Sequence, residues 1–172
     1  MGVQVQAIME FLSESARQAV SLAFREAIYS RHGIITTPHL LIGLVKLQDG
    51  LTQRVLTHFQ VHPKAVRDFL RQLLGFGNVL APQRITMTVR FARVLEIGHQ
   101  LASEAIAPAG STPKAYIEEK HLLMAILQDG LKDPESVTMR ALMKFSLEPQ
   151  AFLAQVILMD GSDRRTSPRT YH

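Results

Sequence analysis

A phrase that occurs twice constrains this 172-residue chain more than any other feature of its sequence. The stretch HLLIGLVKLQDG begins at His39, and the closely similar HLLMAILQDG begins at His121. Self-similarity of this kind indicates either a chemical motif used twice or a structural unit that has been duplicated. The kind of residue that recurs decides between the two.

The duplication extends well beyond this phrase. SESARQAV, starting at Ser13, returns as TVRFARVL at Thr88, and RVLTHFQVHP, starting at Arg54, returns as RALMKFSLEP at Arg140. Apolar residues recur every three or four positions in both copies, which predicts helices with one buried face. What repeats is therefore capping and core spacing, so the phrase is predicted to be architecture. Its core-facing positions are Leu40, Leu41, Leu44 and Val45 in one copy and Leu122, Leu123, Ile126 and Leu127 in the other.

The repeats predict an all-α fold of two four-helix units, because no segment alternates apolar and polar residues for long enough to form a strand. The offset between copies grows from 75 residues (88 − 13) to 82 (121 − 39), and the Pro- and Gly-rich residues 107–113 account for the difference as a loop insertion. The predicted division is an N-terminal extension (1–9), a first unit (10–75), a linker (76–87), a second unit (88–160) and a flexible basic tail or linker (161–172).

Capping residues predict where several helices begin and end. Ser and Thr hydroxyls accept hydrogen bonds from free backbone N–H groups, so Thr37 is expected to be the N-cap of the repeated helix in the first copy. Gly50 and Gly130 are each expected to end that helix in the left-handed conformation. Glu118 and Glu119 are expected at the start of the second copy's helix, where negative charge favours the helix dipole.

Composition excludes several classes of function. The chain contains no cysteine, which removes disulfides, thiolate nucleophiles and cysteine-ligated metals, and no glycine is followed by lysine, which removes a Walker A loop. The formal charge is +4, but the basic residues are scattered and only 6% of residues are aromatic, so nucleic-acid binding is not expected. No secretory signal or membrane-spanning run is visible, and a cytoplasmic protein is expected.

Histidines are the most tempting candidates for catalysis or metal binding. Neither His39 nor His121 has a second histidine or a carboxylate three or four residues further on, so each is expected to hydrogen-bond a neighbouring backbone group where its helix begins. His58 and His62 are four residues apart, but Pro63 is expected to start a new helix, so the two histidines are not expected to share a helix face. The sequence predicts no catalytic residue, no metal site and no cofactor.

The repeated segments SESARQAVSLA, TPHLLIGL and RVL resemble the Clp N-terminal domain, the double-repeat module at the front of Clp-type AAA+ unfoldases. The resemblance covers about residues 10–160. It implies a pseudo-twofold bundle of eight helices that is not itself an enzyme. It also implies partners: unfolded or tagged protein substrates, an adaptor protein, and a Clp ATPase ring carried in the same chain or supplied by another.

The same resemblance implies a peptide- or adaptor-binding groove between the two units. In the family the residue before each repeated histidine is usually glutamate, and in some members these glutamates help to bind phosphorylated arginine. Here proline and lysine occupy the two positions; proline carries no charge, and lysine would repel a guanidinium while tolerating a phosphate. The candidate groove residues are Ser13, Pro38, Lys114, Tyr116, Glu119 and Lys120.

Three functions follow as alternatives. The first is the recognition domain of a Clp-type unfoldase, with residues 161–172 leading to an ATPase ring. The second is a stand-alone accessory protein that keeps the double repeat and docks on a Clp assembly. The third is a basic helical nucleic-acid binder, which steep loss of nucleic-acid binding with rising salt would reveal.

Overall fold

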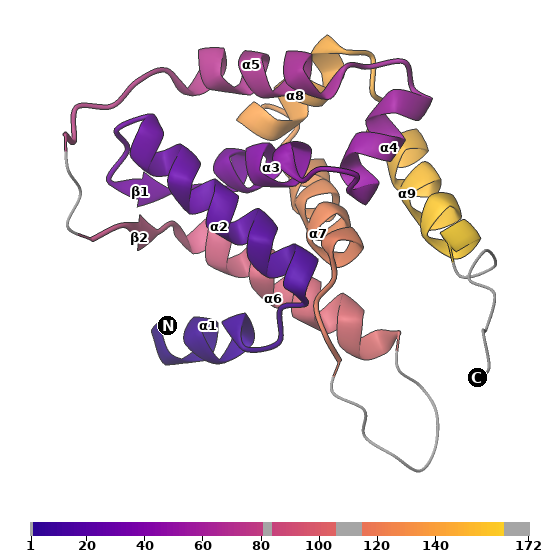
Figure 1. Ribbon diagram of the computed structural model, residues 1–172, viewed down its shortest axis with the longest axis horizontal. Helices are drawn as coiled ribbons and strands as arrows, with labels where there is room; N and C mark the ends of the chain where they lie inside the picture. Colours follow the sequence, from indigo (N-terminus) through magenta and orange to yellow (C-terminus); the bar gives the residue numbers. More distant parts are fainter. Residues whose placement is uncertain (1, 81–83, 106–114, 164–172) are drawn as a thin grey trace.

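The computed structural model describes residues 2–80, 84–105 and 115–163, so the predicted loop at 107–113, Lys114 and the end of the predicted tail lie outside the described residues. Nine helices and two short strands are assigned within those ranges (Figure 1). In chain order they are α1 (Gly2–Met9), α2 (Glu14–Tyr29), β1 (Ile34–Ile35), α3 (Thr37–Lys46), α4 (Leu51–His58), α5 (Pro63–Leu74), β2 (Thr86–Met87), α6 (Val89–Glu104), α7 (Glu119–Leu131), α8 (Val137–Lys144) and α9 (Pro149–Asp163).

The mostly helical fold predicted from the sequence is confirmed, with two differences. Helix α1 lies where only an extension was expected, so the described part of the chain has nine helices rather than eight; Val5 and Ile8 of α1 are buried, and the helix packs on α6. The two strands were also not expected. Each has only two residues, too few for an alternating pattern to be visible in the sequence.

Helices from the two halves of the chain pack against one another. Figure 1 shows α5 beside α8 at the top and α4 beside α9 at the right, and each of these pairs is in contact. Helix α3 contacts both α2 and α7, so it lies at the centre of the bundle. The repeated apolar positions are buried in both copies, as predicted. They include Ala16, Ala19, Val20, Leu40, Leu41, Leu44 and Val45 from the first copy and Phe91, Val94, Leu95, Leu122, Leu123, Ile126 and Leu127 from the second.

Two short parallel pairings link the halves in the same way. β1 pairs with β2, and the N–H of Thr88 donates to the carbonyl of Ile35 at 3.1 Å. The segment before α2 repeats this arrangement, because Leu12 forms a parallel bridge with Ile117 and the N–H of Ser13 donates to the Ile117 carbonyl at 2.9 Å. Each half therefore pairs the start of its first helix with the other half's segment before its second helix.

The glycines of the repeated phrase do not end their helices as expected. Asp49, with φ of 56°, is the left-handed residue after α3, while Gly50 has φ of −71° and is the N-cap of α4. Gly130 lies inside α7, where a Cβ would overlap the side chain of Met139 on α8. The second glycine is thus explained by close packing, which sequence spacing could not reveal.

The histidines of the repeated phrase are structural, as predicted. The Nδ1 atom of His39 accepts from the N–H of Thr36 at 3.1 Å, and the Nδ1 atom of His121 accepts from the N–H of Glu118 at 3.0 Å. Each ring therefore satisfies a backbone donor at the start of its helix. The N-cap of α3 is Thr36 rather than Thr37, which is the first residue of the helix.

Candidate functional site: two equivalent pockets

The first pocket lies where α2, α4 and α7 begin and has a volume of about 630 Å³. We call it the Glu119 pocket. Three of the predicted site residues, Ser13, Glu119 and Lys120, line it together with Gly50 and Leu51. Ser13 is also the N-cap of α2, since its hydroxyl accepts from the N–H of Ala16 at 3.3 Å.

Glu119 serves a helix other than its own. Its carboxylate accepts from the N–H of Leu51 at 2.9 Å, the N–H of Thr52 at 2.8 Å and the hydroxyl of Thr52 at 2.7 Å. Glu118 is the N-cap of α7 and Glu119 is its first residue, as expected. In addition, the Glu119 side chain crosses to the other half of the chain and caps α4. A buried carboxylate is stable here because three donors replace the water it has lost.

Lys120 is held by ion pairs inside the same pocket. It is only 9% exposed, and its Nζ lies 2.9 Å from a carboxylate oxygen of Asp160 and 3.1 Å from one of Glu118. The ammonium group therefore already has anionic partners from α9 and from the N-cap of α7. The Glu119 pocket satisfies its principal charges internally.

The second pocket lies where α3 and α8 begin and has a volume of about 400 Å³. We call it the Thr37 pocket. Pro38, another predicted site residue, lines this pocket and not the first. The two pockets are built from the same positions of the two repeats. At the offsets already described, Thr88 corresponds to Ser13, Thr37 to Glu119 and Pro38 to Lys120; Ser136 corresponds to Gly50 at the offset of 86 (140 − 54) that relates the last repeated segments.

The Thr37 pocket lacks the carboxylate that its counterpart contains. Thr37 is 2% exposed, and its hydroxyl has no hydrogen-bond partner among the described residues. The backbone N–H groups of Val137 and Thr138, equivalent to those that Glu119 holds, likewise find no acceptor within the described part of the chain. Donors that bind a carboxylate in one repeat are therefore free in the other.

The charged groups around the Thr37 pocket are largely engaged. Arg90 bonds to Asp129 through Nε and to Asp133 through Nη1. Burial alone would lower the pKa of Arg90, but the hydrogen bonds to the two carboxylates outweigh it and hold that pKa above its usual range. Glu135 is exposed at the edge of the pocket. The free N–H groups of α8 thus provide the pocket's positive potential.

The remaining predicted residues are not brought into either pocket. Tyr116 is 50% exposed and lines neither, and Lys114 lies outside the described residues. Sequence reasoning missed Thr37 as a site residue. Aligning the two repeats places Thr37 at the position of Glu119, so the alignment would have shown a threonine where the other repeat has a carboxylate.

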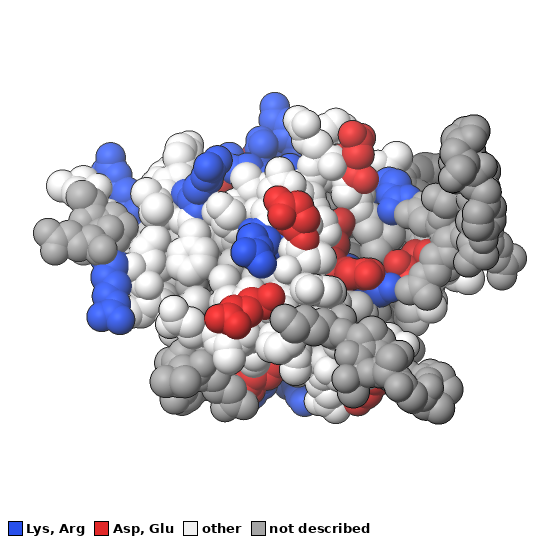
Figure 2. All heavy atoms as spheres, turned by 60° about the horizontal axis from the view of Figure 1, so that its bottom comes forward, with Lys and Arg blue, Asp and Glu red and all other residues white. Residues whose placement is uncertain are grey.

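The surface itself does not favour one sign of charge on the face shown in Figure 2, where acidic and basic side chains are interspersed. Among the described residues no group of three or more His, Asp, Glu or Cys side chains could hold a metal ion. None of the helices within the described ranges is long and apolar enough to cross a membrane.

Comparison with known proteins gives consistent relatives. The family profile described as "Clp repeat (R) N-terminal domain" matches residues 11–130. The chain is 29% identical over 156 residues to the ATP-dependent Clp protease ATP-binding subunit ClpA homolog of Porphyra purpurea, and 25% identical over 155 residues to the negative regulator of genetic competence ClpC/MecB of Bacillus subtilis. These alignments cover 91% and 90% of this chain but 18% of each relative.

Solved structures agree on the fold. The Hsp104 N-terminal domain from Candida albicans superposes with a TM-score of 0.70 at 14% identity, covering 88% of this chain and 92% of that one. The N-terminal domain of ClpV1 ATPase from E. coli gives a TM-score of 0.68 at 18% identity, covering 92% and 91%. With the repeated helices, the paired pockets and the family match in place, the chain belongs to the family of Clp repeat N-terminal domains.

Proposed function

We propose that this chain is a recognition domain that captures protein segments or adaptors for a Clp ATPase ring and has no catalytic activity of its own. Its match to 18% of each ATP-binding relative supports a role as one module beside an ATPase. The ring is carried in the same chain or joined from another; the size of the native protein in a source-cell lysate, compared with 19.2 kDa, distinguishes the two arrangements.

One observation carries the recognition role: the Thr37 pocket contains free donors where the Glu119 pocket contains a carboxylate. Thr37, Val137 and Thr138, whose hydroxyl or N–H donors have no acceptor among the described residues, line this pocket together with Pro38 and Leu74. A carboxylate of a bound polypeptide would satisfy these donors as Glu119 satisfies their equivalents on α4. The apolar neighbours would contact the adjoining part of that polypeptide.

The two positions before the histidines argue against phosphoarginine as the ligand. Pro38 supplies no charge for a guanidinium, and the Lys120 ammonium would repel one. The Thr37 pocket therefore suits a carboxylate of an ordinary protein segment better than a phosphorylated arginine.

A substitution that supplies the missing carboxylate within the chain tests the role of the Thr37 pocket. Thr37→Glu places a carboxylate where Glu119 stands in the other repeat, so we expect it to cap α8, to keep or raise the melting temperature, and to block capture of a permanently unfolded, carboxymethylated protein. Ser103→Glu adds the same charge at an exposed position of α6 and should leave capture unchanged. Fluorescence anisotropy of the labelled unfolded protein measures binding, and circular dichroism measures melting.

Two results would contradict this interpretation. A folded Thr37→Glu protein that captures the unfolded protein as well as the unsubstituted chain does would contradict the pocket's role. Equal loss of binding in Ser103→Glu would assign the effect to net charge instead.

A further inference from the structure

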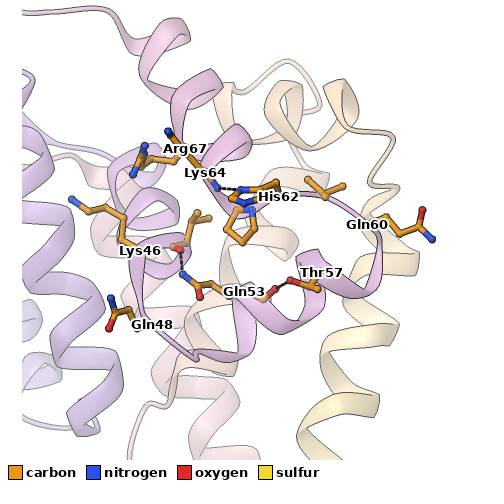
Figure 3. Close-up of a pocket in the computed structure, with 11 residues that line it drawn as sticks. Lys46, Gln48, Gln53, Thr57, Gln60, His62, Lys64 and Arg67 are labelled. Carbon is orange, nitrogen blue, oxygen red and sulfur yellow. Dashed lines mark hydrogen bonds between the residues drawn. The ribbon is translucent and has the colours of Figure 1, made fainter.

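A third pocket lies away from the two equivalent ones, where α3 ends and α5 begins beside α4. Its volume is about 680 Å³, and Figure 3 shows its lining residues. We call it the Lys64 pocket. Three cationic side chains line it: Lys46 from α3, and Lys64 and Arg67 from α5. None of its described lining residues is acidic.

Two of the three cations of this pocket are only weakly engaged, because only Lys46 pairs with a buried carboxylate. Lys46 lies 3.4 Å from Glu26, and Arg67 donates to Asp68 at 2.8 Å, but Asp68 is half-exposed and such surface pairs contribute little. The ammonium group of Lys64 has no ion-pair partner within the described ranges. The pocket also adjoins the N-terminus of α5, whose dipole adds to the positive potential.

The neutral side chains favour a peptide over other anions. Figure 3 places Lys46 and Arg67 at one end of the pocket and Gln60 at the other, with Gln53 between them. Amide side chains both donate and accept, as peptide groups do. Proteins bind single-stranded nucleic acid by stacking its bases on aromatic side chains, and His62 is the only aromatic ring in the described lining.

From these contacts we infer that the Lys64 pocket binds an acidic segment of a polypeptide. Aspartate or glutamate carboxylates of the segment pair with Lys46, Lys64 and Arg67, and its backbone groups meet the glutamine amides. This inference rests on the proposed role in capturing protein segments. It adds a second binding pocket, in which cationic side chains pair with several carboxylates, whereas uncharged donors bind a single carboxylate in the Thr37 pocket.

Fluorescence anisotropy with a labelled ten-residue peptide of alternating Glu and Ser, at low ionic strength, tests the inference. The double variant Lys64→Gln/Arg67→Gln should raise the Kd about fivefold or more, since each exposed charge pair contributes up to about 1 kcal/mol. The control Arg93→Gln/Lys132→Gln removes the same charge from exposed positions outside the three pockets and should change the Kd less than about twofold. A matching peptide of Gln and Ser should bind more weakly to the unsubstituted chain.

Three results would overturn the inference. They are equal weakening by the two double variants, absence of binding by the Glu peptide, and tighter binding of a single-stranded oligonucleotide through Lys64 and Arg67. Repeating the titration in Thr37→Glu separates the two pockets. That variant should still bind the Glu peptide, and loss of the peptide in it would also overturn the inference. In the unsubstituted chain, absence of Glu-peptide binding with capture of unfolded protein intact refutes the Lys64 pocket and leaves the proposed function standing, whereas absence of both refutes the proposed function.

Discussion

At the scale of single residues, Glu119 joins the two halves of the chain most directly. Its buried carboxylate accepts three hydrogen bonds from α4, and glutamine would place an amide N–H₂ against donors. Glu119→Gln should therefore lower the free energy of unfolding by about 1–3 kcal/mol, measured by urea denaturation. Glu96→Gln is the matched control, because Glu96 is exposed on α6 and its loss should cost less than about 1 kcal/mol. Equal costs would show that the cap contributes nothing.

His39 makes stability depend on pH. Its ring is buried, its Nδ1 accepts from the N–H of Thr36, and its Nε2 lies 2.9 Å from Nδ1 of His32. A second proton would have to bind Nδ1 and would remove the acceptor for the Thr36 N–H. Burial, helped by the nearby charge of His32, lowers the pKa of His39 from 6.5 to about 4. The unfolded chain therefore binds a proton more readily between these values. The free energy of unfolding should therefore be unaffected by His39 above about pH 6.5, and it should fall by on the order of 3 kcal/mol as the pH approaches 4.

The measurement is urea denaturation across that pH range, with His39→Gln as the control. Glutamine can still accept from the Thr36 N–H but does not titrate. In this variant the free energy of unfolding should depend less steeply on pH between about 4 and 6.5 than it does in the unsubstituted chain. Parallel curves for the two proteins would exclude His39 as the titrating group.

At the scale of elements, α2 and α3 pack so closely that a glycine is required between them. A Cβ on Gly43 would overlap the backbone carbonyl of Ala19 and lie 3.0 Å from the N of Ala23. Because backbone cannot move aside as a side chain can, Gly43→Ala should lower stability by about 2 kcal/mol or more.

The other repeat supplies the control for this helix pair. Gly98 on α6 meets nothing closer than 3.4 Å, from the Ile117 side chain, so Gly98→Ala should be neutral or should gain up to about 1 kcal/mol of helix propensity. Thermal melting followed by circular dichroism compares the two variants. Similar melting temperatures would mean that the α2–α3 contact adjusts without cost.

At the scale of the whole molecule, the sequence predicted the helices and the buried faces because both depend on local spacing. His39 and His121 bond to the backbone at the starts of their helices, as their positions indicated. The predicted site was only partly assembled, since Ser13, Glu119 and Lys120 share one pocket while Pro38 lies in another.

The features that sequence could not provide all depend on contacts between the halves. The Glu119 side chain reaches α4 across 67 residues of chain to Thr52, and no local pattern indicates that partner. The two-residue strands and the reason for Gly130 likewise depend on segments far apart in the sequence. Long-range pairing, rather than helix formation, is what the sequence left open.

The two parallel pairings between the halves make each repeat depend on the other for its hydrogen bonds. Ser13 needs the carbonyl of Ile117, and Thr88 needs that of Ile35, so a single repeat would leave both a donor and an acceptor unpaired. Two separate copies of one repeat would satisfy each other by the same exchange about a twofold axis. The two halves of this chain therefore exchange contacts as the subunits of a homodimer do, while their pockets differ at one position: a glutamate caps α4 in one, and a threonine leaves the donors of α8 without an acceptor in the other.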